Sequence, residues 1–359
     1  MLVTENFTKK HVAEIAAQTH LSESLVERLI YAFGLLQSLA LVKLPFIFKG
    51  GTSVILHLET PHRLSTDIDI LVNPDTDIDK YIREASGIFP FIGYQEDMRP
   101  SNSTIIKRHF RFEYSPLTSQ NPVTILLDVV FAENPYMHTI QLPVKNTYLI
   151  SDDKEVFVTV PAINSLVADK LTAFAPHTTG VLFGCGKNLE IIKQFFDISV
   201  LAEYISDIAE VHHSYTSVVA AEIDYRGNSI STREVLYDTI NTALCIAGLG
   251  KIRKRDYAEL KDGIDRIQSH IVGRYSADAA ARQAGKIAYL AACLLTEQTR
   301  FTRISDTTMY SNILLKEKPF LWLNFMKKID MTCFGYLVET ERLLTGTDMA
   351  DFLLRESDG

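Results

Sequence analysis

Lys49-Gly50-Gly51-Thr52, followed by Arg63-Leu64-Ser65-Thr66-Asp67-Ile68-Asp69-Ile70, is the most informative part of this chain. Apolar residues 46–48 predict a short strand before the glycine pair, and 52–59 predict a helix after it, capped by Thr52 or Ser53. Residues 67–72 predict a buried strand that begins with alternating polar and apolar side chains. The order of these segments is more specific than any one of them.

Asp67 and Asp69 are two residues apart on the predicted strand, so their side chains project from the same face. Two carboxylates this close repel each other unless a cation offsets their charge. Hard cations such as Mg²⁺ bind carboxylate oxygens and complete their shell with water and substrate phosphate. The pair therefore predicts a divalent-metal site. A solvated strand end, or a turn with capping aspartates, is the alternative.

Gly50 and Gly51 lie at the predicted junction of strand and helix, where a positive φ or close backbone approach suits glycine. Backbone N–H groups at the start of a helix favour an anion such as phosphate. The guanidinium of Arg63 can pair with two phosphate oxygens at once. A plain tight turn is the alternative for the glycine pair alone. Its order with the Asp-x-Asp strand predicts chemistry on a nucleoside triphosphate.

A third acid, Asp128, is the lone charge in Asn121-Pro-Val-Thr-Ile-Leu-Leu-Asp-Val-Val-Phe131, an apolar run that predicts a central strand. A buried carboxylate is costly unless it is paired or bound to metal. Beside Asp67 and Asp69, it predicts a metal ligand or general base for phosphoryl transfer. A satisfied salt bridge or a strand-end position is the alternative.

Residues 104–114 alternate and predict another strand, one face of which carries Lys107, His109, Arg111 and Glu113. That basic face can contact RNA or nucleotide. A solvated sheet face is the alternative.

The glycine pair and the Arg63-x-Ser65-x-Asp67-x-Asp69 strand resemble the signature of the AbiEii/AbiGii abortive-infection toxins, nucleotidyltransferases of the DNA polymerase β-like superfamily. Residues 168–174, Ala-Asp-Lys-Leu-Thr-Ala-Phe, resemble the family helix that bears an acid-Lys-Leu group. Residues 193–198, Lys-Gln-Phe-Phe-Asp-Ile, resemble its Lys/Arg-Asp-x-Tyr-Asp-Leu helix. This chain departs there, with Gln194 for the usual acid and Phe196 for the usual tyrosine. The resemblance covers roughly residues 44–200.

The resemblance implies an α+β fold, in which a polymerase β-like nucleotidyltransferase domain with a mixed sheet is followed by a mainly helical C-terminal domain. It implies a toxin of a type IV toxin–antitoxin system that binds Mg²⁺ (or Mn²⁺) with an NTP, releases pyrophosphate and attaches a nucleotide to an acceptor hydroxyl at the 3′ end of tRNA. A cognate antitoxin protein encoded nearby is the implied partner.

The resemblance also assigns residues to roles. Asp67 and Asp69 would bind metal with Asp128 as the third acid, Lys170 would pair with the triphosphate, and Asp197 would orient Lys170. The expected substrate-binding residues are Lys49, Gly50, Gly51, Thr52, Arg63, Ser65 and Lys193.

Helical spacing gives an independent view of two of these residues. Lys170 lies on or beside the apolar face of its predicted helix, where it either meets an anion or extends to solvent. Asp197 lies off the centre of the apolar stripe of the next helix, so a solvated position is its alternative. The glycine-rich residues 176–187 between these helices are either a lid over the site or a plain connection. Replacing Lys170 with alanine is expected to weaken NTP use without unfolding the chain.

Length and composition limit the number of domains, the compartment and the kinds of partner that are expected. With 359 residues, two domains are expected, residues 1–160 with the nucleotidyltransferase elements and 161–359 contributing Lys170 and Asp197 to the site. No apolar run approaches the ~20 residues needed to span a membrane, and no signal-peptide pattern opens the chain. Four scattered cysteines favour a reduced, cytoplasmic setting. The net charge of −8 argues against broad electrostatic binding to nucleic acid.

Two other functions stay open. The enzyme can modify a small molecule or protein instead of RNA, which the identity of the labelled acceptor decides. Alternatively, the chain is a non-catalytic nucleotide-binding regulatory module, in which case no acceptor is labelled by any NTP.

Overall fold

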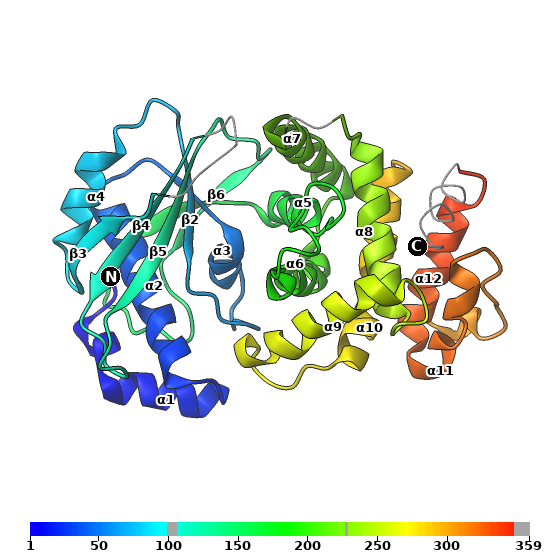
Figure 1. The fold of residues 1–359 in the computed structure, drawn as a ribbon, viewed down its shortest axis with the longest axis horizontal. Helices are drawn as coiled ribbons and strands as arrows, with labels where there is room; N and C mark the ends of the chain where they lie inside the picture. Colours follow the sequence, from blue (N-terminus) through cyan, green and yellow to red (C-terminus); the bar gives the residue numbers. More distant parts are fainter. Residues whose placement is uncertain (99–105, 227–228, 348–359) are drawn as a thin grey trace. The chain divides into compact units, whose positions relative to one another are not determined.

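The computed structural model describes residues 1–98, 106–226 and 229–347 (Figure 1). These residues group into two compact units. The first contains Met1–Asn134, His138–Ala162 and Ser269–Arg274; the second contains Pro135–Met137, Ile163–Gln268 and the described residues from Tyr275 onward. Residues 104–105 of the predicted strand, and 227–228 and 348–359 of the predicted second domain, lie outside the described residues.

The described residues of the first unit form a seven-stranded sheet with strand order β3-β4-β5-β2-β1-β7-β6. The strands are β1 (Ile47–Lys49), β2 (Ile68–Val72), β3 (Phe91–Glu96), β4 (Ile106–Tyr114), β5 (Val123–Phe131), β6 (Thr139–Pro143) and β7 (Phe157–Pro161). β2 runs parallel to β5, and β1 runs parallel to β7. The remaining neighbours are antiparallel. The sheet is therefore mixed, as predicted.

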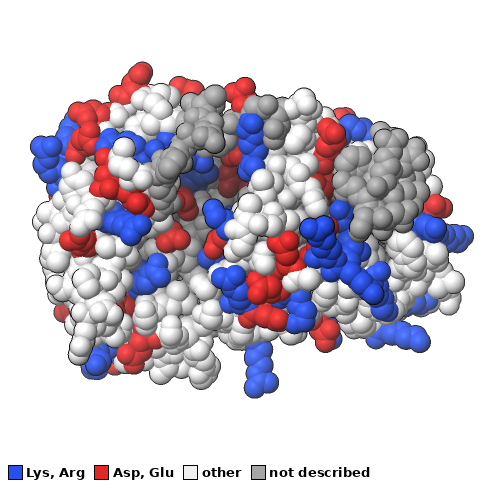
Figure 2. Space-filling model, in the orientation of Figure 1, with Lys and Arg blue, Asp and Glu red and all other residues white. Residues whose placement is uncertain are grey.

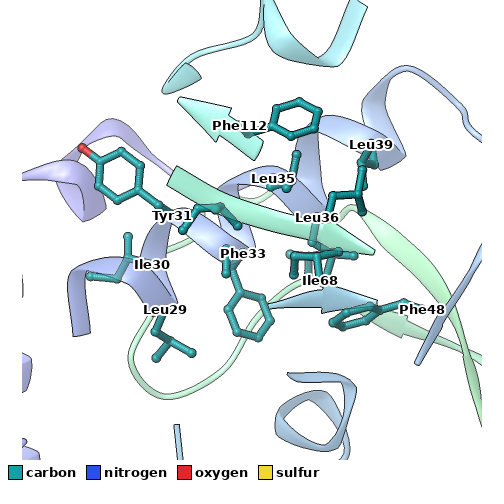
Figure 3. Packing of buried hydrophobic residues seen from close by; sticks show 14 of the residues in the cluster. Leu29, Ile30, Tyr31, Phe33, Leu35, Leu36, Leu39, Phe48, Ile68 and Phe112 are labelled. Atoms are coloured by element: carbon teal, nitrogen blue, oxygen red, sulfur yellow. The ribbon is translucent and has the colours of Figure 1, made fainter. Parts of the chain in front are cut away.

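Helix α2 (Glu23–Leu41) covers one face of this sheet. It begins at the N-cap Ser22, whose side chain accepts a hydrogen bond from the Leu25 N–H. Figure 3 shows its apolar side chains, such as Phe33 and Leu36, packed with Phe48 of β1 and Ile68 of β2. The unit also contains α1 (Lys9–Thr19), α3 (Gly50–His57) and α4 (Ile78–Ser86).

Strand periodicity divides the sheet into two faces. On the α2 side, Phe110 of β4, Leu127 of β5 and Ile68 of β2 are directly opposite one another and fully buried. Neighbours in sequence point to the opposite face, and there Asp69 and Asp128 are only partly buried. Core packing against α2 thus leaves the carboxylates on the other side of the sheet.

The second unit is helical over the described residues. Its α-helices are α5 (Ile163–Ala173), α6 (Asn188–Leu201), α7 (Ile208–Arg226), α8 (Thr232–Ala247), α9 (Lys254–Ile267), α10 (Ala277–Leu295), α11 (Met326–Ile329) and α12 (Met331–Leu344). A mixed sheet followed by a mainly helical region confirms the predicted α+β architecture.

A short segment, Ser269–Arg274, leaves this helical region and belongs to the sheet unit. The Leu64 N–H donates to the His270 carbonyl (2.8 Å), and the Val272 N–H donates to the His62 carbonyl (3.0 Å). Arg63 faces Ile271 in the resulting β-bridge. These backbone hydrogen bonds fix the chain segment that carries Arg63 and Ser65.

Among the described residues, only α2 is long and apolar enough to cross a membrane by length and composition. The protein buries 72% of its 18-residue apolar window, as a core helix does. All four cysteines are free: Cys185 is exposed, while Cys245, Cys293 and Cys333 are buried.

Candidate nucleotidyl-transfer site

The glycine pair forms the start of α3. Gly50 has a φ of +76°, a conformation that side chains with a Cβ rarely adopt. The helix begins at Gly50, two residues earlier than predicted, and its N-cap Lys49 makes no side-chain cap. The predicted capping role of Thr52 and Ser53 is therefore wrong. Thr52 Oγ1 instead donates to the Asp67 carbonyl (2.6 Å), which ties the helix start to the beginning of β2.

Both glycines are in close contact with predicted site residues. A Cβ on Gly50 would overlap the Asp69 carboxylate and would lie 2.8 Å from its Cγ. A Cβ on Gly51 would lie 2.5 Å from Arg63 Nη2 and 3.1 Å from Ser65 Oγ. Arg63 is buried, and its Nη1 donates to the Leu64 carbonyl (3.4 Å). The absent side chains thus let an acid, a guanidinium and a hydroxyl approach the helix start.

Four strands contribute one polar residue each to a row across the face of the sheet opposite α2. Lys49 of β1 is opposite Asp69 of β2, Asp69 is opposite Asp128 of β5, and Asp128 is opposite His109 of β4. Residues directly opposite on neighbouring strands point to the same face. The row therefore brings two acids together, with a cation and an imidazole at its ends.

Two further contacts shape the charge around this row. The Nδ1 of His109 lies 2.6 Å from Asp128 Oδ1, and the His109 side chain is only 15% exposed. Arg28 of α2 pairs with Asp67 across 3.9 Å, where both side chains are about half exposed. Exposed pairs of this kind contribute at most about 1 kcal/mol, so the Arg28–Asp67 pair can rearrange when another cation is present.

The described residues contain no group of three or more His, Cys, Asp or Glu side chains arranged to hold a metal ion. Mg²⁺ is usually held by only one or two carboxylates, with substrate phosphate and water completing its shell. Asp69 and Asp128 are adjacent oxygen donors, and the missing Cβ of Gly50 leaves backbone beside them. This donor set fits a cation that arrives with a phosphate.

Lys170 of α5 is buried with two partners from α6. Its Nζ lies 3.0 Å from Asp197 Oδ2, and it donates to Gln194 Oε1 (3.1 Å). The Lys170 and Asp197 side chains are 3% and 2% exposed, so neither extends to solvent. Lys193, by contrast, pairs with Glu190 one turn away (2.9 Å). Gln194, which replaces the usual acid of the family motif, thus accepts a hydrogen bond from Lys170.

The loop between α5 and α6 is attached to acidic side chains of later helices. His177 donates through its N–H to Asp238 (2.8 Å), and its Nε2 lies 3.1 Å from Asp256. Gly184 donates through its N–H to Glu259 (2.9 Å). The hydrogen bond with Asp256 raises the pKa of His177, and burial raises the pKa of Asp238 to about 6.

The sequence matches the family described as "Nucleotidyl transferase AbiEii toxin, Type IV TA system" over residues 35–283. The chain belongs to this family. The predicted family is confirmed, and this AbiEii-family member is a nucleotidyltransferase by family. The match spans the glycine turn, the three acids, Lys170 and Asp197.

Comparison with solved structures finds several distant neighbours, among them two from Helicobacter pylori. One is JHP933, at 12% identity and a TM-score of 0.42, covering 77% of this chain and 94% of JHP933. The other is described as a candidate nucleotidyltransferase, at 11% identity and a TM-score of 0.41, covering 76% of this chain and 96% of the neighbour. Comparison with curated protein sequences found no match.

Three contacts of this AbiEii-family chain did not emerge from sequence reasoning. Arg28 lies in α2, which precedes the motif in the chain, and no sequence pattern links it to Asp67. His109 was part of an alternating face, but periodicity alone does not name its partner Asp128. Gln194 was noticed as a departure from the motif, and its bond to Lys170 required the fold.

Proposed function

We propose that this nucleotidyltransferase transfers a nucleotide from a metal-bound NTP to the 3′-terminal hydroxyl of tRNA, as the toxin of a type IV system. The observation that carries the proposal is the alignment of Asp69 with Asp128 beside Gly50. Two acids at a glycine turn suit a cation and a phosphate together. The acids are also accessible, since both are only partly buried.

Asp67, Asp69 and Asp128 are the proposed residues for a divalent cation, Mg²⁺ or Mn²⁺. When bound, such an ion supplies charge neutralisation and orients the triphosphate. Gly50 and Gly51 admit phosphate to the start of α3, with Arg63 and Ser65 beside them. Lys49, at the end of the row, adds a positive charge next to Asp69. Thr52 serves the site indirectly, by holding the Asp67 backbone.

Lys170 is the proposed cation for the triphosphate, and Asp197 the residue that orients it. Support comes from their ion pair, since a lysine ammonium has three donors and Asp197 and Gln194 account for two of them. The anion is proposed to accept a hydrogen bond from the same ammonium. Lys193 is proposed to bind substrate more weakly, because Glu190 already neutralises it.

The tRNA acceptor rests on family membership. On the face drawn in Figure 2, Lys and Arg side chains are interspersed with Asp and Glu. With a net charge of −8, such a surface attracts RNA phosphates weakly at long range. We therefore propose that the acceptor end is held locally, and that transfer depends only modestly on salt.

The test is incubation of purified protein with total RNA, Mg²⁺ and each labelled NTP, followed by sequencing of the labelled species. Labelled tRNA 3′ ends support the proposal. Label in a small molecule or in protein would support nucleotidyl transfer but contradict tRNA as the acceptor. No label with any NTP, metal or acceptor would overturn the transfer reaction itself.

We also propose a cognate antitoxin encoded nearby and action in the cytoplasm. The family is that of a toxin–antitoxin system, and four free cysteines suit a reducing compartment. Co-expression of the adjacent gene should restore growth to cells that express this protein. Growth arrest that no neighbouring gene relieves would contradict the partner.

A further inference from the structure

We infer that His109 is a positioning residue, which holds Asp128 in the orientation that the proposed site requires. The inference rests on the proposed function. The motif residues identified from sequence do not include His109, because it lies on β4, outside the glycine turn and the Asp-x-Asp strand.

The contact is short and well defined. His109 Nδ1 lies 2.6 Å from Asp128 Oδ1, and the two residues are direct partners in the β4–β5 register. A carboxylate only accepts hydrogen bonds, so Nδ1 carries the hydrogen and donates it. With Oδ1 held from one side, rotation of the carboxylate is restricted and the direction of Oδ2 is set.

Two other residues on the strand face of His109 have different partners. Arg111, two residues along, is engaged by Asp97 (2.9 Å). Glu113 accepts a hydrogen bond from Gln95 (2.7 Å). His109 instead lies at the end of the row that continues through Asp128 to Asp69. Its side chain is 15% exposed, which restricts other orientations of the ring.

An imidazole that is hydrogen-bonded to a metal-binding carboxylate can fix the orientation of that carboxylate. Such partners orient the binding atoms, and their loss typically weakens metal affinity or activity about 10–100-fold. His109 would thereby act through Asp128, without touching the substrate.

Three substitutions of His109 distinguish a hydrogen bond donated by Nδ1 from one donated by Nε2 and from the loss of both donors. His109→Asn places its amide nitrogen near the position of Nδ1 and retains a donor toward Asp128. His109→Gln places it near the position of Nε2, and His109→Ala removes both donors. The matched control is His213→Asn, at an exposed histidine of α7 in the second unit.

The first measurement does not depend on activity. Long-range ¹H–¹⁵N NMR spectra of the imidazoles should show the His109 hydrogen on Nδ1, and Asp128→Ala should alter that signature. Free Mn²⁺ measured by electron paramagnetic resonance should show about 10-fold weaker binding in His109→Ala and in His109→Gln. Binding in His109→Asn and His213→Asn should stay close to that of the unmodified protein.

Kinetic measurements distinguish failure of the His109 positioning role from failure of the proposed nucleotidyl transfer. His109→Ala should lower kcat about 10-fold or more with an unchanged KM for NTP, and His109→Asn should recover most of it. A hydrogen found only on Nε2, or an alanine variant with unchanged Mn²⁺ binding and kcat, overturns the positioning role alone. Recovery by glutamine instead of asparagine overturns it too, because Nε2 would then be the working atom. Unmodified protein that neither binds Mn²⁺ nor transfers nucleotide overturns the proposed function and this inference with it.

Discussion

Asp69 of β2 lies directly opposite Asp128 of β5, and the two strands run parallel. Neighbouring strands are about 4.8 Å apart, so the two carboxylates are close enough to repel each other without a compensating charge. Lys49 and His109 flank the pair from the next strands on either side. An arrangement that collects negative charge beside a glycine turn is suited to a substrate that brings its own cation.

Replacing Asp69 with asparagine should reduce nucleotide transfer at least about 100-fold, the usual loss when one group that stabilises developing charge is removed. The same variant should relieve toxicity on overexpression. Initial rates with saturating labelled NTP measure the first effect, and colony counts the second.

The matched control is Asp75→Asn, an exposed aspartate just beyond the same strand. It removes one negative charge without touching the row. Equal activity of the Asp69 and Asp75 variants would contradict the site assignment.

Gly50→Ala should abolish most activity, because a Cβ there displaces the Asp69 carboxylate. A non-glycine residue in the left-handed region also costs about 1–2 kcal/mol of stability. Gly186→Ala separates the two effects, since Gly186 has a φ of +68° and open space around its Cα. Thermal melting and initial rates of both variants should show similar destabilisation but loss of activity only at Gly50. Equal rates would mean that Asp69 tolerates displacement.

Lys170→Ala should destabilise the helical unit, contrary to the sequence-based expectation of an intact fold. Removing one partner of a buried ion pair leaves an uncompensated charge and typically costs about 3–5 kcal/mol. Here Asp197 would be left at 2% exposure. Urea unfolding should show this loss for the single variant.

The double variant Lys170→Met with Asp197→Asn removes both charges and should recover much of the stability. It should still use NTP poorly, because the ammonium is gone. A double variant with full activity would show that Lys170 does not contact the triphosphate.

Stability of the loop around His177 should fall as pH rises above the ordinary histidine range. The hydrogen bond with Asp256 raises the pKa of His177 in the folded protein. Its stabilising charge is therefore fully present below the unfolded-state pKa of about 6.5 and is lost as pH rises through the higher folded value. The raised pKa of Asp238, about 6, acts in the same direction, since its protonated form is favoured by folding. Asp256 and Arg253 complete the charges that face the ring.

Melting temperatures at pH 6 and pH 8.5 measure this effect, and His177→Gln is the comparison. Glutamine keeps a donor toward Asp256 but does not titrate, so its melting temperature should change less between the two pH values. The same change in both proteins would assign the pH dependence to other groups.

The strand that carries Asp69, and the glycine turn before it, were predictable because both depend on local periodicity and local backbone conformation. Asp67, expected on the same strand, lies one residue before β2 begins. The interior strand that carries Asp128 was also predictable from its apolar run. The expected capping role of Thr52 was wrong, because the helix begins at Gly50 and the Thr52 hydroxyl donates to the Asp67 carbonyl instead. Local propensity cannot foresee a partner from another element.

Residue spacing along the chain was thus enough to predict the mixed sheet, the glycine turn and the family. Three contacts came only from the folded chain: Asp128 lies opposite Asp69, His109 contacts Asp128, and Gln194 joins Asp197 around Lys170. Strand order and register set the first two contacts, and packing of α5 against α6 sets the third. Such pairings join residues far apart in the chain, and each depends on long-range burial that no short stretch of sequence encodes.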